Sequence, residues 1–343
     1  MYIWAEAGPC EGDIEYAKRA AHAVHKAGAH ALKVQWLTPD TIFSKEAARY
    51  DHTPGEWILQ ADGYPKVIPY ADWREIADLC VTLGIGFVPS LFDVSAVRVA
   101  AEMDLAMVKV ASGDITNEQL IKAIGTSKIP NITISTGAST IEEVTQAVRW
   151  VQESDPSKSI TLLACHLEYP TEVVNAHLGR IVALRDQFPN LNVGYSDHTS
   201  GLDTVPLAVC LGAQVLEKHF TLDRDIGVGD HSFAVDGDDL VEMVHLSQLT
   251  LSVVDNIELE PTPGEQAARV GARRSLYAAR DIESGSHITE DDLVPLRPYS
   301  SEAVDASCFE ETVGLRAFVD IAKGDPIGKK LVGLVGASLT VDE

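Results

Sequence analysis

The stretch NVGYSDHTSGLDTVPLAVCLGAQVLEKHF, residues 192–220, contains two short apolar runs that each end at a histidine. The histidines, His198 and His219, are 219 − 198 = 21 residues apart, which is the length of one strand–helix–strand step. The strands of such a step are parallel, so both side chains would emerge at one rim, close enough to share a divalent metal ion. Alternation along the strand puts Glu217 on the same face as His219. Taken singly, each histidine could instead be a hydrogen-bonded structural residue.

Short apolar runs alternate with longer amphipathic stretches from the N-terminus to about residue 255, a pattern typical of βα units. The helical patterns, several of them opened by an Asp or Thr N-cap, include Asp13 to Ala27, Tyr70 to Leu83, Thr140 to Val151 and Asp238 to Val254. The expected strands are 2–6, 31–36, 85–90, 107–111, 130–135, 160–165, 192–195 and 214–219. Because eight such units close a parallel barrel, the sequence predicts an α/β fold, a (β/α)8 TIM barrel.

Nearly every residue suited to chemistry sits at the C-terminal end of one of these runs, the barrel end where active sites are built. These residues are Glu6, Lys33, Gln35, Ser90, Asp93, Lys109, Ser112, Ser135, Thr136, Gly137, Tyr169, Ser196, His198, Glu217 and His219. Two lysines that face into a barrel mouth are costly without an anionic partner. Together with three serines at the strand ends, they offer what a ligand carrying a phosphate and a carboxylate needs; this set is Lys33, Lys109, Ser90, Ser112 and Ser135. The alternative is that both lysines pair with barrel carboxylates such as Glu6 or Glu217.

The chain has 343 residues, 45% of them hydrophobic, and a formal net charge of −24. This length predicts one large domain and one small domain. The acidic balance argues against DNA, RNA or an anionic membrane surface as partner, because each needs a basic face. The cysteines, at 10, 80, 165, 210 and 308, show no CxxC spacing and are expected to be reduced thiols. Without a signal segment or a membrane-spanning stretch, the expected location is the cytoplasm.

A proline-rich hinge, Glu258 to Gly264, separates the barrel pattern from a different one. The run LYAARDI at 276–282 is echoed by LRAFVDI at 315–321, an offset of 315 − 276 = 39 residues. Each half reads as strand, turn, glycine and strand, which predicts a compact, mostly β module. We therefore expect a barrel domain over 1–258, a linker over 259–272 and a small domain over 273–343. In the small domain, the candidate for a role in chemistry is Arg297, which could also be an ordinary surface arginine.

In their order and spacing, these motifs resemble the sialic acid synthase family, which includes the N-acetylneuraminate, legionaminate and pseudaminate synthases. The matching motifs cover nearly the whole chain and are Ala5-Glu6-Ala7-Gly8, Lys33-Val34-Gln35, Phe92-Asp93, KVASGD at 109–114, STG at 135–137, Tyr169-Pro170-Thr171, YSDHTSG at 195–201, EKHF at 217–220, Gly229-Asp230-His231 and RRSL at 273–276. The resemblance implies a (β/α)8 barrel followed by a SAF (antifreeze-like) domain. It also implies a domain-swapped homodimer in which the small domain of one chain caps the barrel of the other.

The resemblance implies a transferase that condenses phosphoenolpyruvate with the open-chain aldehyde of a sugar, N-acetylmannosamine or a relative, and releases phosphate by C–O cleavage. Such enzymes use a divalent metal, typically manganese, with magnesium or cobalt as alternatives. The metal ligands implied are His198 and His219, and the phosphoenolpyruvate ligands are Lys33, Ser90, Lys109, Ser112, Ser135 and Ser196. The sugar contacts implied are Glu6, Gln35, Tyr169, Asp230 and Arg297 of the partner subunit. In this chemistry Glu217 would take a proton from the attacking water or orient it, and Lys109 would help to fix the phosphate.

Three segments depart from the family's usual pattern. The run from Glu6 to Gly12 is one residue shorter and lacks a His and an Asn, Leu167 stands where a polar residue is usual, and Arg297 precedes Pro-Tyr-Ser-Ser instead of Pro-Gly-x-Gly. These changes leave the acceptor open. One alternative function is a 3-deoxy-heptulosonate or 3-deoxy-octulosonate phosphate synthase, although no second basic cluster is visible for a phosphorylated acceptor. The other is a degenerate, non-catalytic sugar-binding protein, although both histidines and both lysines are retained.

Overall fold

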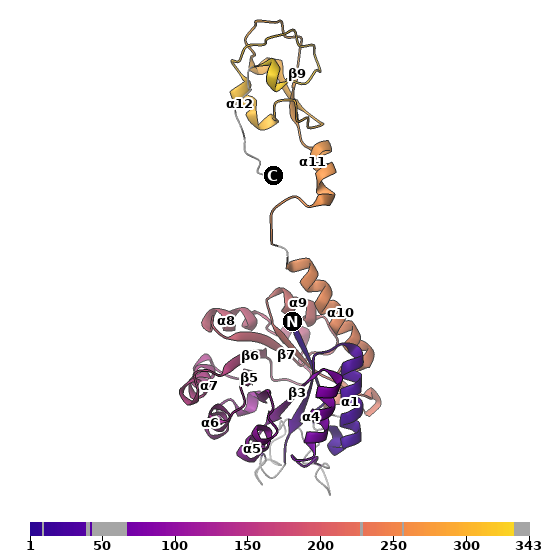
Figure 1. Cartoon of the computed structure of the whole chain (residues 1–343), viewed down its shortest axis with the longest axis vertical. Coiled ribbons are helices and arrows are strands. Elements are labelled where there is room, and N and C mark those ends of the chain that lie inside the picture. Colours follow the sequence, from indigo (N-terminus) through magenta and orange to yellow (C-terminus); the bar gives the residue numbers. More distant parts are fainter. Residues whose placement is uncertain (9, 39–41, 43–66, 227–228, 256, 333–343) are drawn as a thin grey trace. The chain divides into compact units, whose positions relative to one another are not determined.

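The computed structural model describes residues 1–8, 10–38, 42, 67–226, 229–255 and 257–332. The described chain forms two compact units, one that ends at the 256–257 boundary and one that begins at Ile257 (Figure 1). Pro9 and the last residues of the predicted small domain, 333–343, lie outside the described residues.

The first unit is a closed barrel of eight parallel strands that follow one another in sequence order. The strands are β1 Tyr2–Glu6, β2 Ala31–Trp36, β3 Gly86–Leu91, β4 Met107–Val110, β5 Asn131–Ser135, β6 Ser159–Cys165, β7 Asn192–Asp197 and β8 Val215–His219. The barrel closes where β1 pairs with β8, with Glu6 opposite His219. The predicted barrel is confirmed, and each predicted run agrees with its strand to within two residues.

Helices cover the outside of the barrel (Figure 1). They are α1 Ile14–Ala27, α4 Trp73–Leu83, α5 Val94–Glu102, α6 Glu118–Thr126, α7 Ile141–Ser154, α8 Gly179–Gln187, α9 Thr204–Cys210 and α10 Gly237–Val254. Side-chain N-caps explain where several begin: Asp13, Asp93, Thr140 and Asp236 each accept hydrogen bonds from backbone N–H groups of the first turn. Short 3₁₀ turns in this unit are η1 Cys10–Gly12, η3 Ser112–Asp114, η4 Val173–Asn175, η5 Arg224–Ile226 and η6 Gly229–Ser232.

An apolar plug fills the interior of the barrel. It consists of Trp4, Ala31, Val88, Leu163 and Val215, with Met107 packed against it. Gly194 of β7 makes this packing possible, since a Cβ added there would lie 2.4 Å from the carbonyl oxygen of Val215 and 2.7 Å from a methyl of Leu163. The plug forms a dry floor beneath the C-terminal ends of the strands.

On most strands, the next inward-facing residue toward the C-terminal end from this floor has a polar side chain. Successive side chains of a strand alternate between the two faces of the sheet, so a step of two residues stays inside the barrel. Seven strands step in this way from an apolar residue or glycine to a polar or thiol side chain: Trp4 to Glu6, Ala31 to Lys33, Val88 to Ser90, Met107 to Lys109, Leu163 to Cys165, Gly194 to Ser196, and Val215 to Glu217. A second step reaches Gln35, His198 and His219. The strand register therefore concentrates polar groups at this end of the barrel.

A buried ion pair joins strands β7 and β8 on the outer face of the barrel wall. Lys218 Nζ lies 2.8 Å from Asp197 Oδ2 and donates to the carbonyl of Thr199 at 2.7 Å. The Thr204 hydroxyl at the start of α9 donates to the same carboxylate at 2.7 Å. Burial opposes ionisation of Asp197, but the Lys218 ammonium and these hydrogen bonds outweigh it and lower its pKa. The pair thus fastens a helix to two strands.

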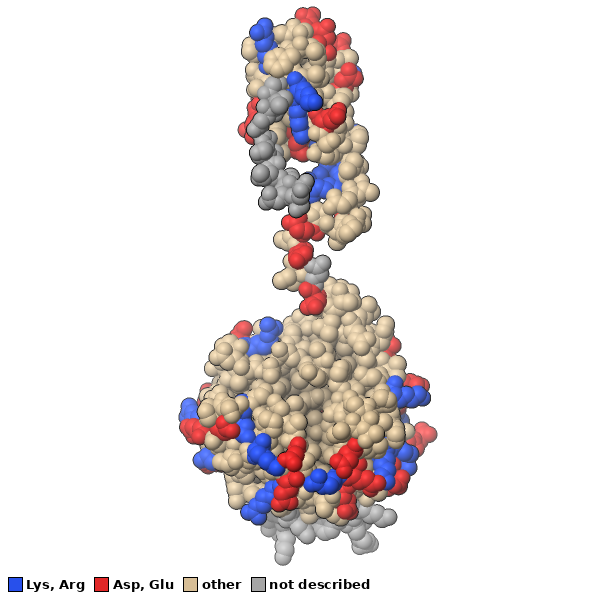
Figure 2. All heavy atoms as spheres, in the orientation of Figure 1, with Lys and Arg blue, Asp and Glu red and all other residues tan. Residues whose placement is uncertain are grey.

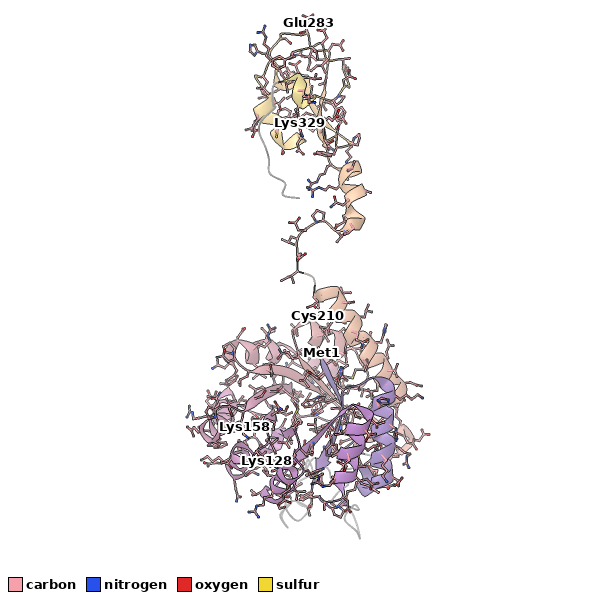
Figure 3. All side chains as sticks on the ribbon, in the orientation of Figure 1. Met1, Lys128, Lys158, Cys210, Glu283 and Lys329 are labelled. Atoms are coloured by element: carbon pink, nitrogen blue, oxygen red, sulfur yellow. The ribbon has the colours of Figure 1, made fainter. Side chains whose placement is uncertain are left out.

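The charges on the barrel surface are mixed in sign. On the face shown in Figure 2, basic and acidic side chains are interspersed over the outer helices. Met1, at the start of β1, and Cys210, at the end of α9, lie at the amino-terminal end of the strands, opposite the polar mouth (Figure 3). Within the described residues, none of the helices combines the length and the apolar composition needed to cross a membrane.

The second unit confirms the internal duplication physically. Its strands β9 Ser275–Ala278 and β10 Leu293–Leu296 are antiparallel, and its helices and turns are α11 Gln266–Ala272, α12 Phe309–Thr312, η7 Pro263–Glu265, η8 Glu290–Asp292, η9 Ala306–Cys308 and η10 Lys329–Leu331. Ile282 and Ile321, equivalent in the repeat, exchange two backbone hydrogen bonds of 2.9 Å. Gly285 and Gly324 both adopt left-handed φ, at 86° and 88°. Helix α11 lies within the predicted linker.

Candidate active site

Two buried lysine–carboxylate pairs lie at the C-terminal end of the barrel. Lys33 contacts Glu6, and Gln35 Nε2 donates to the same carboxylate at 2.6 Å. Lys109 Nζ lies 2.9 Å from Glu217 Oε1. Burial opposes the charge of Glu6, but Lys33, His219 and Lys109 hold its pKa well below the usual range. The alternative considered from the sequence, that the lysines pair with these carboxylates, is therefore what the ligand-free chain shows.

Several polar atoms beside these pairs lack partners. Ser90 Oγ, Ser135 Oγ and Glu217 Oε2 are buried and, among the described residues, have no hydrogen-bond partner. Ser90 is aligned with Lys109 across β3 and β4, and Ser135 ends the next strand. Buried polar atoms are nearly always hydrogen-bonded in folded proteins. Two hydroxyl donors beside two ammonium groups therefore indicate the place of an anionic ligand.

The loop after β5 approaches this place with its backbone. Gly137 N donates to Ser112 Oγ at 3.0 Å. A Cβ added at Gly137 would lie 2.8 Å from Ser112 Oγ, 3.1 Å from Cys165 Sγ and 3.3 Å from Cβ of Leu167. Only glycine fits between these side chains. Leu167, a departure from the family pattern, thus borders the loop that carries Ser135.

The two predicted metal ligands lie side by side. The ring centroids of His198 and His219 are 5.3 Å apart, and each residue is 4% exposed. His198 Nδ1 lies 2.7 Å from the carbonyl oxygen of His166, and His219 Nδ1 lies 3.3 Å from Asp230 Oδ2. Burial opposes protonation of His219, but the carboxylates of Glu6 and Asp230 outweigh it and raise the pKa.

These imidazoles fit a divalent metal. In each ring Nδ1 faces an oxygen acceptor, which fixes the tautomer and leaves Nε2 as the coordinating atom, the usual arrangement of metal-binding histidines. Within the described parts of the chain, no group of three or more His, Cys, Asp and Glu side chains is arranged to hold a metal ion. The donor set would therefore be two imidazoles, with the remaining positions open to other ligands.

Aromatic rings cover the histidines. The ring of Tyr169, 39% exposed, lies 4.3 Å from that of His198. Phe233 lies 5.2 Å from the His219 ring and 6.0 Å from the Tyr169 ring. Tyr169 was predicted to contact the sugar, whereas Phe233 was missed, because it lies in a loop beyond the last strand where no periodicity applies.

Cys165 is a second missed residue. It points into the barrel beside Ser112, with Sγ 3.8 Å from His198 Nδ1. Burial opposes ionisation of the thiol, but the electrostatic interactions of Cys165 with His198 and Lys109 outweigh it and lower the pKa of the thiol. Counting two residues from Leu163 along β6 would have identified it as inward-facing.

The predicted site residues of the first unit gather at the C-terminal end of the barrel. Most lie on or just after the strand ends, and Asp230 lies in η6, beyond β8. Arg297 belongs to the second unit, where it is exposed and directly follows β10. The Tyr277 hydroxyl donates to the carbonyl of Pro298 at 2.9 Å and holds the loop that carries Arg297.

A model of the NeuB family matches residues 20–257. The chain belongs to the NeuB family. A model of the SAF domain matches residues 273–332, within the second unit. This confirms the resemblance seen in the sequence and the fold of a barrel followed by a SAF domain.

Relatives of this NeuB-family chain are named as synthases. It is 31% identical to N,N'-diacetyllegionaminic acid synthase of Legionella pneumophila over 331 residues, covering 94% of this chain and 92% of the relative. It is 32% identical to pseudaminic acid synthase of Campylobacter jejuni over 320 residues, covering 92% of each. The crystal structure of N-acetylneuraminic acid synthetase from Leptospira borgpetersenii matches with a TM-score of 0.67 at 26% identity, covering 78% of this chain and 89% of that one. The prediction of a synthase-type enzyme is confirmed.

Proposed function

We propose that the chain condenses phosphoenolpyruvate with the open-chain aldehyde of a sugar and releases phosphate. The observation that carries this proposal is the pair of unpartnered hydroxyls, Ser90 and Ser135, beside the buried ammonium groups of Lys33 and Lys109. A ligand with a phosphate and a carboxylate supplies the acceptor oxygens that these donors need. The names of the relatives, synthases of sialic, legionaminic and pseudaminic acids, support the same reaction class.

The lysines would act by position and charge. Lys109 and Lys33 would exchange part of their contact with Glu217 and Glu6 for phosphoenolpyruvate oxygens, with Ser112 and Ser196 beside them. Because burial in a low dielectric strengthens each charge-assisted contact, the ammonium groups would hold the enol phosphate with C3 toward the aldehyde.

A divalent metal, for which we expect manganese with magnesium or cobalt as alternatives, would be held by His198 and His219 and would polarise the aldehyde oxygen as a Lewis acid. His166 and Asp230 would keep the two rings oriented through their Nδ1 atoms. The ring of Tyr169, which packs on His198, would limit the access of water to the two histidines. Gln35, fixed on Glu6, would contact the sugar hydroxyls together with Asp230.

The proposed bond changes balance as follows. The C3 atom of phosphoenolpyruvate forms a bond to the aldehyde carbon, water adds to C2, and the bond between C2 and the bridging oxygen breaks as the C2 carbonyl forms. Of the two protons of the water, one ends on the former aldehyde oxygen, now a hydroxyl, and the other on the released phosphate. Glu217 would take a proton of that water, a role supported by its Oε2, which has no partner among the described residues while Ser196 and Lys109 hold Oε1. The products are a 2-keto-3-deoxy acid and inorganic phosphate, which carries away the bridging oxygen.

The assay is aldehyde-dependent phosphate release from phosphoenolpyruvate, with free aldoses that include N-acetylmannosamine and with manganese. Oxygen-18 in the bridging position is expected in the phosphate, and chelation is expected to abolish turnover. Label retained in the keto acid would overturn the C–O cleavage. Activity only with a phosphorylated aldose would favour the heptulosonate-type alternative, and phosphoenolpyruvate-independent sugar binding alone would favour a non-catalytic protein.

The second unit would complete the site in a homodimer. We expect Arg297 of the partner subunit to reach the acceptor, as the family resemblance implies. Mixing inactive Arg297→Ala and His219→Ala proteins under conditions that exchange subunits should restore part of the activity, because some mixed dimers hold one intact site. A fully active monomer would contradict the assignment.

A further inference from the structure

The turn between β1 and α1 has an unusual backbone. Gly8, Cys10, Glu11 and Gly12 all have positive φ, between 52° and 63°. Two of these residues carry side chains, for which the left-handed region is unfavourable. Strained residues of this kind persist where the surroundings enforce them, and they cluster at functional sites. The Cys10 side chain is fully buried beneath the turn, so that Glu11 is directed outward.

Glu11 meets a residue that lies 220 positions later in the chain. Its Oε1 lies 2.8 Å from His231 Nε2, and His231 Nδ1 lies 2.8 Å from Thr221 Oγ. The Thr221 hydroxyl also donates to the carbonyl of Asp223 at 2.9 Å. Since a carboxylate only accepts, His231 donates its Nε2–H to Glu11. The imidazole ring is thus held at both nitrogens, by Glu11 and by Thr221.

The contact between Glu11 and His231 holds the segment that covers His219. Asp230, adjacent to His231, faces His219 Nδ1 at 3.3 Å, and the Phe233 ring lies 5.2 Å from the His219 ring. The backbone N–H of Val235 then donates to the carbonyl of His219 at 2.9 Å. One end of the segment is tied to β8 by backbone, and the other is tied to the β1–α1 turn by Glu11 and His231.

We propose that Glu11 and His231 are positioning residues that fix Asp230 and Phe233 over His219 and so shape the acceptor side of the site. The inference rests on the proposed function. The contact between Glu11 and His231 is called the latch below. The proposed phosphoenolpyruvate groups come from β2, β3, β4, β5 and β7 and from η3 after β4, whereas the latch joins the β1–α1 turn to the segment after β8. Loss of the latch should therefore weaken use of the aldehyde and spare phosphoenolpyruvate.

The kinetic test separates the two substrates. Glu11→Ala should lower kcat/KM for the aldehyde by about 10–100-fold, the usual effect of losing an outer partner of a site residue. The KM for phosphoenolpyruvate should stay within about threefold of wild type, since no phosphoenolpyruvate ligand touches the latch. Glu11→Gln keeps an oxygen acceptor for His231 Nε2–H and should restore most of the aldehyde efficiency. Glu15→Ala, which removes only an exposed contact with Lys18, is the matched control and should behave as wild type.

A second readout does not depend on activity. Hydrogen–deuterium exchange of residues 229–235 should accelerate in Glu11→Ala and remain slow in Glu11→Gln and Glu15→Ala. Faster exchange in a protein that turns over no aldehyde would support the latch and overturn the proposed function. Unchanged exchange, or faster exchange with unchanged aldehyde kinetics in an active enzyme, would overturn the positioning role.

Discussion

Neighbouring residues of β8 make two lysine–carboxylate contacts that differ in completeness. On the outer face, Lys218 and Asp197 satisfy one another together with Thr199 and Thr204. On the inner face, Glu217 contacts Lys109, but its Oε2 has no partner in the part of the chain that the structure describes. Burial is nearly the same for both, so burial alone does not separate a structural pair from a functional one. The hydrogen bonds that remain unmade do separate them.

The largest effect is expected on the outer face. Lys218→Met leaves Asp197 as a buried charge without its cation, which should lower the free energy of unfolding by about 3–5 kcal/mol. Denaturant unfolding measures this loss. Lys128→Met is the matched control, because its partner Asp104 is 77% exposed and an exposed ion pair is worth about 1 kcal/mol or less. Equal losses in both variants would contradict the comparison.

On the inner face the same substitution should act on ligand binding. Lys109→Met would remove the proposed charge-assisted contact to phosphoenolpyruvate, worth about 1.5–3 kcal/mol, and the expected result is a roughly 10–100-fold weaker affinity at 1.4 kcal/mol for each factor of ten. Titration calorimetry with phosphoenolpyruvate checks it. An unchanged affinity, with a loss of stability as large as that of Lys218→Met, would make the inner pair structural as well.

A third ion pair, between Arg280 and Asp292 of the second unit, tests how the contribution to stability changes when the cation is exposed. Asp292 is buried, but its partner Arg280 is 58% exposed. Burial opposes ionisation of Asp292, yet hydrogen bonds from Arg280 and Thr289 lower its pKa to about 2. Asp292→Asn should lower the free energy of unfolding by about 1–2 kcal/mol. Because the folded pKa is depressed, this contribution is present above the unfolded pKa of roughly 3.9 and is lost as the pH falls toward 2.

Calorimetry of the full chain at pH 7 and near pH 2 checks that sign. The difference between wild type and Asp292→Asn should shrink at the lower pH. A difference that grows as the pH falls would mean that the carboxylate is not stabilised by its partners.

The smallest effect is expected for Ser90→Ala, which should leave the stability of the fold unchanged or slightly higher but weaken ligand binding. Ser90→Ala removes a buried hydroxyl for which the described residues offer no partner, so the melting temperature should be unchanged or slightly higher. The affinity for phosphoenolpyruvate should fall by about 0.5–1.5 kcal/mol, the worth of one neutral hydrogen bond. A lower melting temperature with unchanged affinity would reverse the assignment of this serine.

The parts of the molecule that repeat were predictable from the sequence. Period-two alternation located the strands and placed residues such as Lys33, Ser90 and His219 at one end, because the register of a parallel barrel follows from its strand pattern. The same alternation would have added Cys165. The alternation did not decide whether the lysines pair with carboxylates or with a ligand, because the sequence pattern does not show which of these groups lies nearer to each lysine.

Contacts made by loops were not predictable in this way. The contact between Glu11 and His231 depends on a run of left-handed backbone and on a loop beyond the last strand, and neither has a period. Phe233 was missed for the same reason. The need for glycine at 194 follows from the packing of Leu163 and Val215, which becomes visible only once the strands are in register.

The apolar plug imposes an order of entry. A barrel filled by Trp4 and its neighbours is closed at the plug, so any ligands of its polar end would enter and leave by the same route. Lys33, Lys109 and Ser90 lie one inward step above the plug, and His198 and His219 lie one step higher, roughly 7 Å along the strand at 3.3 Å per residue. Whatever binds at the lysines must arrive before the molecule that binds at the histidines, and it becomes enclosed once that second molecule is in place.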